Sequence, residues 1–416
     1  MSGAPDRRRG ACPTLPAPMA TGDGLLARIA LAAPAMPVAL IALGALAKRH
    51  GNGLIDVTAR GKLQIRGLTP VSAPRLAADV AALTDNGLPI REGLEIQSGA
   101  LAGRDPAMAF DPRPIVETIA AGAAGGLAGR LAPKVAVVVD GGGALPLAGL
   151  SGDIVLMPGG EGRLALFAGG VRLGTVPAER AAAATLALLH RLAQEGPAAR
   201  MTELVGRHGA ESFADRLAGT GFAVQPGDAA PALAVEPIGR FQLADGGLAL
   251  GFGVAFGQIE ADALSGIAEV AQRLGADGVA PVPGRALLLL GVRPEAAEAV
   301  RKQAVALGFI AQPDDPRRHI FACPGAPRCA SGRLPARALA GLVANRLGEG
   351  LGGRDLHISG CAKGCAHPAP ADITLVGLDE GAGLVLQGTA RGAPGRRFAA
   401  ADLLDEVARL LETDLG

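Results

Sequence analysis

The sequence predicts an α+β fold that arose by duplication of a two-module unit, in which a small module and a larger α/β module each occur twice. Two internal repeats carry this prediction. The first aligns residues 48–68 with 273–293, and the second aligns residues 153–156 with 372–375. The two offsets, 225 and 219, are nearly equal and the segments keep their order, as expected of a single duplication.

Hydrophobic periodicity and Gly turns predict the elements inside the repeats. Each small module is expected to hold an Ala/Leu-rich helix that ends at a Gly turn and leads into a strand, at 63–66 and at 287–290. Each large module is expected to contain a helix, a strand, a Gly-rich loop, a β-hairpin and a second helix. The predicted helices of the large modules span residues 115–131, 179–194, 334–347 and 400–412.

Clusters of Gly, Pro and Asp near residues 92, 235 and 312 mark the expected boundaries. The predicted order is an N-terminal tail, the first small module, the first large module, the second small module and the second large module. These segments span residues 1–20, 21–92, 93–235, 236–312 and 313–416.

The charge balance excludes some classes of partner. The 416 residues hold 40 basic and 39 acidic side chains, a formal net charge of +1, which argues against a general nucleic-acid or membrane-surface binder. Residues 29–47 carry no charge and are nearly long enough to span a bilayer, but Pro34 and Pro37 interrupt them. Because the repeat places this segment opposite an amphipathic helix at 262–274, we expect a strand, a turn and a buried helix. We also expect a cytoplasmic protein without a membrane or export segment.

Four of the five cysteines lie within 43 residues and form two spaced pairs, C-x5-C and C-x3-C: Cys323, Cys329, Cys361 and Cys365. Disulfides would need an oxidising compartment, which nothing here supports. A structural zinc site would typically use shorter spacers at both ends. The Gly, Ala and Pro residues around these cysteines leave room for inorganic sulphides, so the pattern favours a single iron–sulphur cluster. The fifth cysteine, Cys12, is interpreted as an incidental thiol in a Pro-rich segment.

The second repeat distinguishes the two large modules. At an offset of 219, Cys361 and Cys365 fall on Gly142 and Pro146, so the first large module is expected to lack cluster ligands.

The cysteine pattern resembles that of the sulfite and nitrite reductase superfamily, in which two ferredoxin-like half-modules alternate with two larger α/β modules. Residues 58–67, T-A-R-G-K-L-Q-I-R-G, also resemble a segment that lines the anionic tetrapyrrole pocket in that superfamily. The resemblance implies this role for Arg60 and Arg66. Of the pair of lysines that binds sulfite or nitrite in the reductases, only Lys134 has a counterpart.

A closer resemblance is to the precorrin-3B synthases of oxygen-dependent cobalamin biosynthesis. It rests on S-G-C-A-K-G-C-A-H-P around the second cysteine pair, on A-C-P-G-A-P-x-C-A-S around the first, on V-D-G-G-G (139–143) and on P-M-A-T-G-D-G-L-L (18–26). The resemblance implies a 4Fe-4S cluster, a mononuclear non-haem iron and a reaction of precorrin-3A with O2. It further implies monooxygenation, with a hydroxyl group added at the meso carbon between the first and last rings and a lactone closed by a ring acetate.

Precorrin-3A is a polycarboxylate, and guanidinium groups bind carboxylates through paired hydrogen bonds. We therefore expect carboxylate contacts from Arg60, Arg66 and Lys134, with Lys363 and Arg104 as weaker candidates. Catalytic residues are not identifiable, because no pair of His with a carboxylate has the spacing of an iron site. His357 and His367 near the cysteines are expected to pack or to support the cluster, and Asp23, between two glycines, is interpreted as a turn residue.

No nicotinamide or flavin motif is present, so electrons are expected from an external donor, a ferredoxin or an NADH-linked reductase. Two alternatives stay open at this point. One is a siroheme-dependent sulfite or nitrite reductase, and the other is a binding module or carrier with a structural zinc site.

Overall fold

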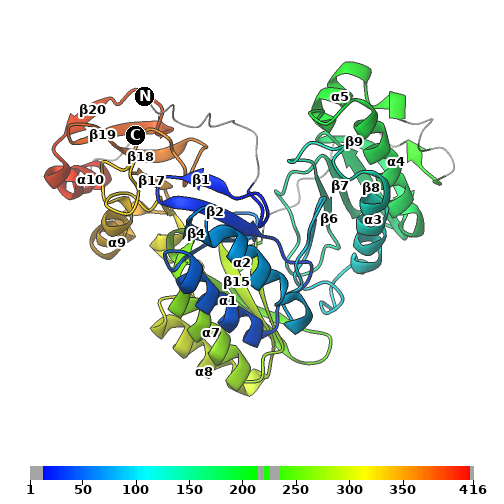
Figure 1. Ribbon diagram of the computed structural model, residues 1–416, viewed down its shortest axis with the longest axis horizontal. Coiled ribbons are helices and arrows are strands. Elements are labelled where there is room, and N and C mark those ends of the chain that lie inside the picture. Colours follow the sequence, from blue (N-terminus) through cyan, green and yellow to red (C-terminus); the bar gives the residue numbers. More distant parts are fainter. Residues whose placement is uncertain (1–12, 214–216, 218–219, 225–234, 413–416) are drawn as a thin grey trace.

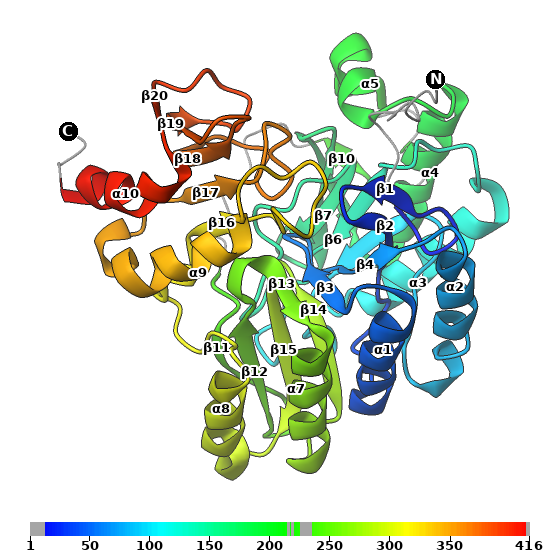
Figure 2. The same cartoon turned by 60° about the vertical axis from the view of Figure 1, so that its left-hand side comes forward.

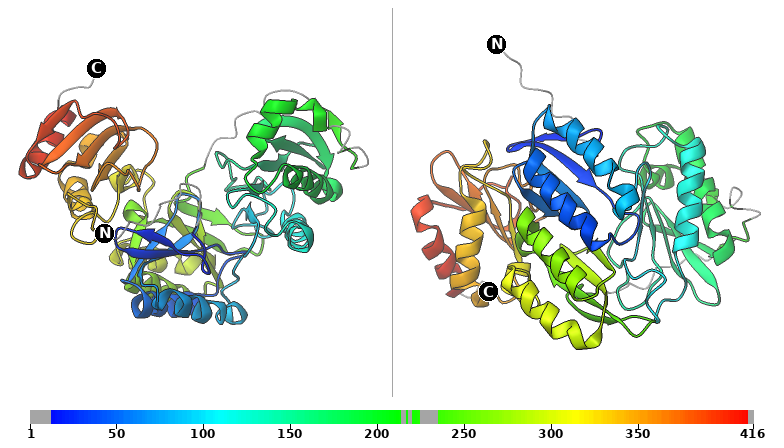
Figure 3. Two further views of the ribbon diagram at one scale, coloured as in Figure 1. Left: turned by 45° about the horizontal axis from the view of Figure 1, so that its top comes forward. Right: turned by 60° about the horizontal axis from the view of Figure 1, so that its bottom comes forward.

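The computed structural model describes residues 13–213, 217, 220–224 and 235–412, and Cys12 lies outside these ranges (Figure 1). Two small modules pack together at the centre, and the two large modules stand apart on either side of them (Figures 1 and 3). Each module is a β-sheet covered by helices. No helix among the described residues is long and apolar enough to cross a membrane.

The two small modules have the same sheet topology. The first sheet has the order β1-β2-β4-β3 and the second the order β11-β12-β15-β14, and both are antiparallel. The strands of the first sheet are β1 (Met19–Thr21), β2 (Gly24–Ile29), β3 (Leu54–Val57) and β4 (Leu63–Leu68). Those of the second are β11 (Gly239–Gln242), β12 (Leu248–Gly253), β14 (Gly278–Val282) and β15 (Ala286–Val292). Their helices are α1 (Pro37–His50), α2 (Ser72–Ala81), α7 (Ala261–Arg273) and α8 (Ala297–Ala306). This matched order confirms the predicted duplication.

A single hydrophobic core joins the small modules. The uncharged stretch forms α1, which packs against α7 (Figure 3, right). Gly44 permits the close approach, since a Cβ there would lie 2.2 Å from Ser265 Oγ and 3.0 Å from the Ala261 carbonyl oxygen. A further strand, β13 (Gln258–Glu260), leaves the second small module and pairs with β3 of the first.

The large modules share a second topology, in which parallel strands at one side of the sheet continue into an antiparallel meander. In the first, the strands are β5 (Glu95–Ser98), β6 (Ala136–Val139), β7 (Ile154–Pro158), β8 (Arg163–Ala168), β9 (Val171–Pro177) and β10 (Ala223–Val224). In the second, they are β16 (Ile320–Ala322), β17 (Leu356–Ser359), β18 (Ala371–Gly377), β19 (Ala382–Gly388) and β20 (Arg396–Phe398). The covering helices are α3 (Arg113–Gly126), α4 (Ala181–Gln194), α5 (Met201–His208), α9 (Ala336–Leu347) and α10 (Leu403–Glu412) (Figure 2).

The structure differs from the expected division at the N-terminus. The segment assigned to a tail, 1–20, is in part structured, because Leu15 is buried in the core of the small modules and β1 begins at Met19. The remaining boundaries stay predictions.

Candidate functional site

The four clustered cysteines lie beyond the carboxyl ends of two neighbouring strands. Cys323 follows β16, and Cys361 comes two residues after β17. Because β16 and β17 are parallel, their carboxyl ends meet at one edge of the sheet, where the loops that follow carry Cys329 and Cys365. The Gly360 N–H lies 3.2 Å from Cys323 Sγ, so one loop donates a hydrogen bond to a thiol of the other.

A turn from the first small module closes this cysteine site. The Gly22 carbonyl oxygen accepts a hydrogen bond from the Ala330 N–H at 2.9 Å, in the loop that carries Cys329. A Cβ at Gly22 would lie only 2.1 Å from Cys329 Sγ. The β1–β2 turn therefore reaches the sulphur only because residue 22 is glycine, and no motif in the sequence had indicated this contact.

The cysteine site fits an iron–sulphur cluster. Burial raises the pKa of Cys323 and of Cys365, and the charges of the neighbouring cysteines contribute to both shifts, which places the thiols in one electrostatic group. Among the described residues, no three His, Cys, Asp or Glu side chains are arranged to hold a single metal ion. In a cluster each thiolate binds a different iron, so its ligands stand further apart than those of one ion. The expected mononuclear iron has no three-ligand set in the described part of the chain.

Two histidines pack beside the cluster loops. His357 on β17 is fully buried, and neither of its ring nitrogens has a hydrogen-bond partner among the described residues. Burial, with a smaller contribution from His367, lowers the pKa of His357 to about 4, so the ring is neutral at physiological pH. The His367 ring lies 4.1 Å from the Phe321 ring, between their centroids. These contacts are those of packed side chains.

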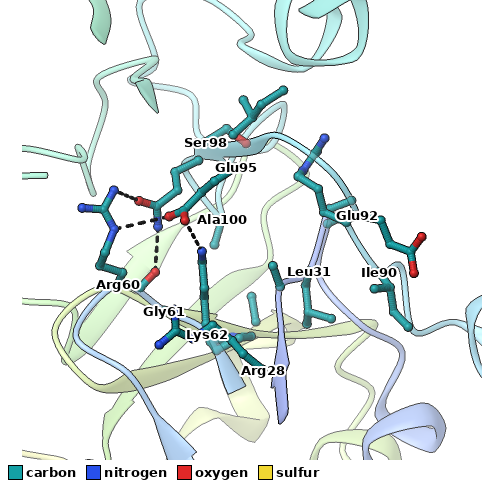
Figure 4. A pocket seen from close by; sticks show the side chains of 18 of the residues that line it. Arg28, Leu31, Arg60, Gly61, Lys62, Ile90, Glu92, Glu95, Ser98 and Ala100 are labelled. Atoms are coloured by element: carbon teal, nitrogen blue, oxygen red, sulfur yellow. Dashed lines mark hydrogen bonds and ion pairs between the residues drawn. The ribbon is translucent and has the colours of Figure 1, made fainter. Parts of the chain in front are cut away.

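A second candidate site is a cavity of about 360 Å³ between the first large module and the two small modules, of which the second contributes residues 280–283 (Figure 4). Its lining contains more cationic than anionic side chains. The cations are Arg28, Arg60, Lys62, Arg91 and Arg113, and the anions are Glu92 and Glu95. An excess of positive charge in a partly enclosed space favours an anionic ligand.

Arg60 lines this cavity, as the resemblance implied, and it also joins the two modules. Its guanidinium donates to Gln97 Oε1 at 2.6 Å and to the Ser151 carbonyl oxygen at 2.9 Å, and it lies 3.4 Å from Glu95 (Figure 4). Lys62 Nζ lies 2.5 Å from the same carboxylate. Glu95 therefore neutralises part of the positive charge that these two side chains bring to the cavity.

Two further arginines in the cavity have no carboxylate partner in the part of the chain that the structure describes. Neither Arg28 nor Arg91 forms an ion pair with any described residue, and Arg91 Nε is buried without a hydrogen-bond partner. Burial lowers the pKa of Arg91, and the charge of Glu117 offsets part of that shift. Sequence reasoning missed both arginines, since neither belongs to a motif.

Arg66 does not line the cavity. Its guanidinium makes two hydrogen bonds to Asp23, at 2.7 and 2.8 Å, and one to Asp56 at 2.7 Å. The Asp23 side chain is 2% exposed and the Arg66 side chain 13% exposed, so the group is an internal ion triad. The structure thus favours a structural role for Arg66, and Asp23 is its partner and not only a turn residue.

The other predicted carboxylate-binding residues also lie outside the cavity. Lys134 is exposed in the turn before β6, and only its neighbour Pro133 contributes to the lining. Lys363 lies in the loop between Cys361 and Cys365 and donates to Ser331 Oγ at 2.6 Å. Arg104 forms ion pairs with Asp245 and Asp277 and so ties the first large module to the second small module.

Replacing Arg66 by Met is expected to lower the free energy of unfolding by about 3 kcal/mol, because it leaves two carboxylates uncompensated in the interior. Burial by itself would raise the pKa of Asp23, but Arg66 holds it below its ordinary value of 3.8. The stabilisation is therefore complete above that value and is lost as the pH falls through the lowered pKa. Urea denaturation followed by circular dichroism should show wild type and variant converging at acidic pH. Unchanged stability at pH 7 would contradict the structural role.

The comparisons with known proteins agree with this geometry. The profile of the nitrite/sulfite reductase ferredoxin-like half domain matches residues 18–83. A solved structure, that of the Mycobacterium tuberculosis NirA protein, superposes with a TM-score of 0.71 at 18% identity, covering 93% of this chain and 80% of that one. Sulfite reductase [ferredoxin] 2 of Mycolicibacterium paratuberculosis is 29% identical over 37% of this chain and 30% of its own length.

The duplicated fold and the half-domain match give the chain the fold of the nitrite and sulfite reductases. The precorrin-3B synthase of Sinorhizobium sp. is 38% identical over 408 residues, which cover 93% of this chain and 84% of that protein. The chain belongs to the precorrin-3B synthase family, the enzymes of cobalamin biosynthesis.

Proposed function

We propose that the chain catalyses the oxygen-dependent conversion of precorrin-3A to precorrin-3B in aerobic cobalamin biosynthesis. One oxygen atom of O2 is added to the macrocycle as a hydroxyl group, a ring acetate closes a lactone, and the second oxygen atom leaves as water. The two electrons that this balance requires come from an external donor, a ferredoxin or an NADH-linked reductase. The observation that carries the proposal is the 38% identity to a precorrin-3B synthase along almost the whole chain.

The cavity supports a polycarboxylate substrate. Arg28 and Arg91 line it and form no ion pair with a carboxylate of the described residues, and guanidinium groups bind carboxylates through charge-assisted hydrogen bonds. Arg60 and Lys62 both form ion pairs with Glu95. They therefore join the two modules at the cavity and contribute positive charge to its lining. We assign Arg28 and Arg91 as the principal carboxylate-binding residues, with Arg60 in a supporting position.

Polar side chains on the first small sheet connect this cavity to the cysteine site. With its amide oxygen toward Arg28 and its nitrogen toward Asp56, Gln64 accepts from Arg28 at 2.7 and 2.8 Å and donates to Asp56 at 3.2 Å. Asp56 in turn contacts Arg66, which holds Asp23 next to the turn at Gly22. This continuous row of hydrogen-bonded side chains favours binding of the macrocycle across the sheet. Its carboxylates would then lie at the cavity and its opposite edge would face the cysteines.

The cysteine site would hold a 4Fe-4S cluster, with Cys323, Cys329, Cys361 and Cys365 as ligands. Such a cluster supplies electrons one at a time. The chain's own contribution is to cover part of Cys323, to donate the Gly360 N–H to its sulphur, and to close the site with the turn at Gly22. A mononuclear iron that activates O2 is also proposed from the family resemblance, and its ligands are not assigned.

The decisive experiment is anaerobic incubation of the reduced, purified protein with precorrin-3A, followed by addition of ¹⁸O-labelled O2. Mass spectrometry should show one labelled oxygen atom in the product macrocycle and the second in water. A product without label would overturn the proposed reaction.

The alternative is a siroheme-dependent sulfite or nitrite reductase, which the half-domain match and the partial similarity to sulfite reductases favour. An ultraviolet–visible spectrum separates the two functions. A strong Soret band that survives repurification would indicate bound siroheme. Zinc near one per chain without acid-labile sulphide would instead indicate a structural zinc site.

A further inference from the structure

Arg337 occupies a position between the cysteine site and the small modules. It lies in the first turn of α9. Its guanidinium is over the Phe256 ring, 5.5 Å from the centroid, and contacts two main-chain carbonyl oxygens, Ala255 O at 3.4 Å and Ala322 O at 3.3 Å. Ala322 is the residue before Cys323. This side chain therefore joins the second large module, which carries it, to the second small module.

The hydrogen bonding of Arg337 is incomplete in the described part of the chain. Both carbonyl contacts are long, and Nε is buried without a partner. No carboxylate lies within ion-pair distance of it among the described residues, whereas the neighbouring Arg318 pairs with Glu236 at 2.7 Å and Arg66 has Asp23 and Asp56. A partly buried guanidinium with spare donors and no counter-ion is costly unless an anion balances it.

The charge of Arg337 persists at neutral pH. Burial lowers its pKa to about 10, and the charges of Asp56 and Cys323 oppose that shift. Arg285 is a second such cation: it stacks on Phe321 at 4.2 Å, and its hydrogen bonds to described residues go to the carbonyl oxygens of Arg318 and Ile320. The sequence repeat aligns Arg285 with Arg60, but Arg60 has Glu95, whereas Arg285 forms no ion pair with a described residue. Two arginines without an ion-pair partner among the described residues thus lie on the cysteine side of the molecule.

An iron–sulphur cluster with four thiolate ligands is a net anion, and it gains one further negative charge on reduction. We propose that Arg337 is the counter-charge of this cluster and raises its reduction potential. The inference rests on the cluster assigned under the proposed function. Arg337 acts through the cluster and so is a positioning residue. Its charge stabilises the reduced state more than the oxidised state, which favours acceptance of an electron from the external donor.

The test is an EPR-monitored redox titration of the purified holoprotein with Arg337→Gln, Arg337→Lys and Arg346→Gln. Arg346 is exposed near the other end of the same helix, so its replacement is a matched loss of charge far from the cysteines. For Arg337→Gln we expect wild-type iron and sulphide content and at least a tenfold fall in the equilibrium constant for reduction, about 59 mV for a one-electron couple. Arg337→Lys and Arg346→Gln should each change that constant by less than about threefold.

Three outcomes would overturn the inference. One is an intact cluster with unchanged potential in Arg337→Gln, and another is an equal fall in Arg346→Gln. If Arg337→Gln assembles no cluster, the test rests on Arg337→Lys. A tenfold fall in the equilibrium constant for reduction in that variant would show that the charge of residue 337 does not set the reduction potential. Absence of iron and sulphide from the wild-type protein would contradict the proposed cluster itself, which is a separate failure.

Discussion

Replacing any one of Cys323, Cys329, Cys361 or Cys365 by Ser should remove the cluster, with loss of the broad visible absorption and of nearly all bound iron and acid-labile sulphide. The expectation follows from the geometry, because the four residues form one electrostatic group at a single sheet edge and each would bind a different iron. The second large module should also become less stable, since the cluster would no longer join its two cysteine-bearing loops. Iron and sulphide analysis with circular dichroism measures both effects.

Two matched controls sharpen this test. Cys12→Ser should leave the iron and sulphide content intact, and loss of the cluster in that variant would show that the ligand set is wrong. Gly22→Ala should reduce cluster content, because its Cβ would lie 2.1 Å from Cys329 Sγ. Gly125→Ala, on α3 with open space around the added Cβ, should have no such effect.

Removing Arg91 should weaken precorrin-3A binding by about tenfold to a hundredfold while leaving the cluster and the fold intact. A charge-assisted hydrogen bond contributes roughly 1.5–3 kcal/mol, and about 1.4 kcal/mol is one decade in affinity. Because Arg91 has no ion-pair partner among the described residues, its loss breaks no salt bridge there. Arg91→Lys should fall between wild type and Arg91→Ala, since it keeps the charge and loses the planar fork.

The measurement is an anaerobic absorbance titration with precorrin-3A. Arg75→Ala, an exposed position on α2, serves as the charge-matched control and should bind normally. Arg60→Ala should also weaken binding, and Arg60→Lys less so. Unlike Arg91→Ala, Arg60→Ala should in addition loosen the contact with Gln97 and Ser151. Unchanged affinity for Arg28→Ala, Arg60→Ala and Arg91→Ala together would eliminate the cavity as the carboxylate site.

The architecture was predictable because, after a duplication, each helix or strand occurs twice in the sequence and can be recognised from either copy. The repeat at an offset of 225 aligns β4 with β15 and α2 with α8, and both pairs occupy equivalent places in the two sheets. The short parallel strands β16 and β17 were not predicted, because three or four buried residues leave no alternation to detect. The cysteines were recognisable since their spacing is local.

The residues proposed to bind carboxylates were harder to predict because their roles depend on distant partners. Arg66 stands in a motif that implies a tetrapyrrole contact, yet Asp23, 43 residues away, pairs with it. Arg91 belongs to no motif, and it lines the cavity because its segment pairs with the chain just after β2, where the Arg91 N–H donates to the Ala30 carbonyl oxygen. A motif identifies a residue type at a position. It does not specify which carboxylate the folded chain brings to that residue.

The packing of α1 against α7 has a consequence for how the chain is made. Lys48 and Asp262, which form an ion pair at this helix contact, are 214 residues apart in sequence. During synthesis the apolar face of α1 therefore emerges long before its partner helix exists. The face of α1 at Gly44, which packs against Ser265 and Ala261, stays without its partner until the chain beyond residue 273 has left the ribosome. Folding of this core is thus late, of high contact order, and exposed to aggregation or chaperone capture in the interval.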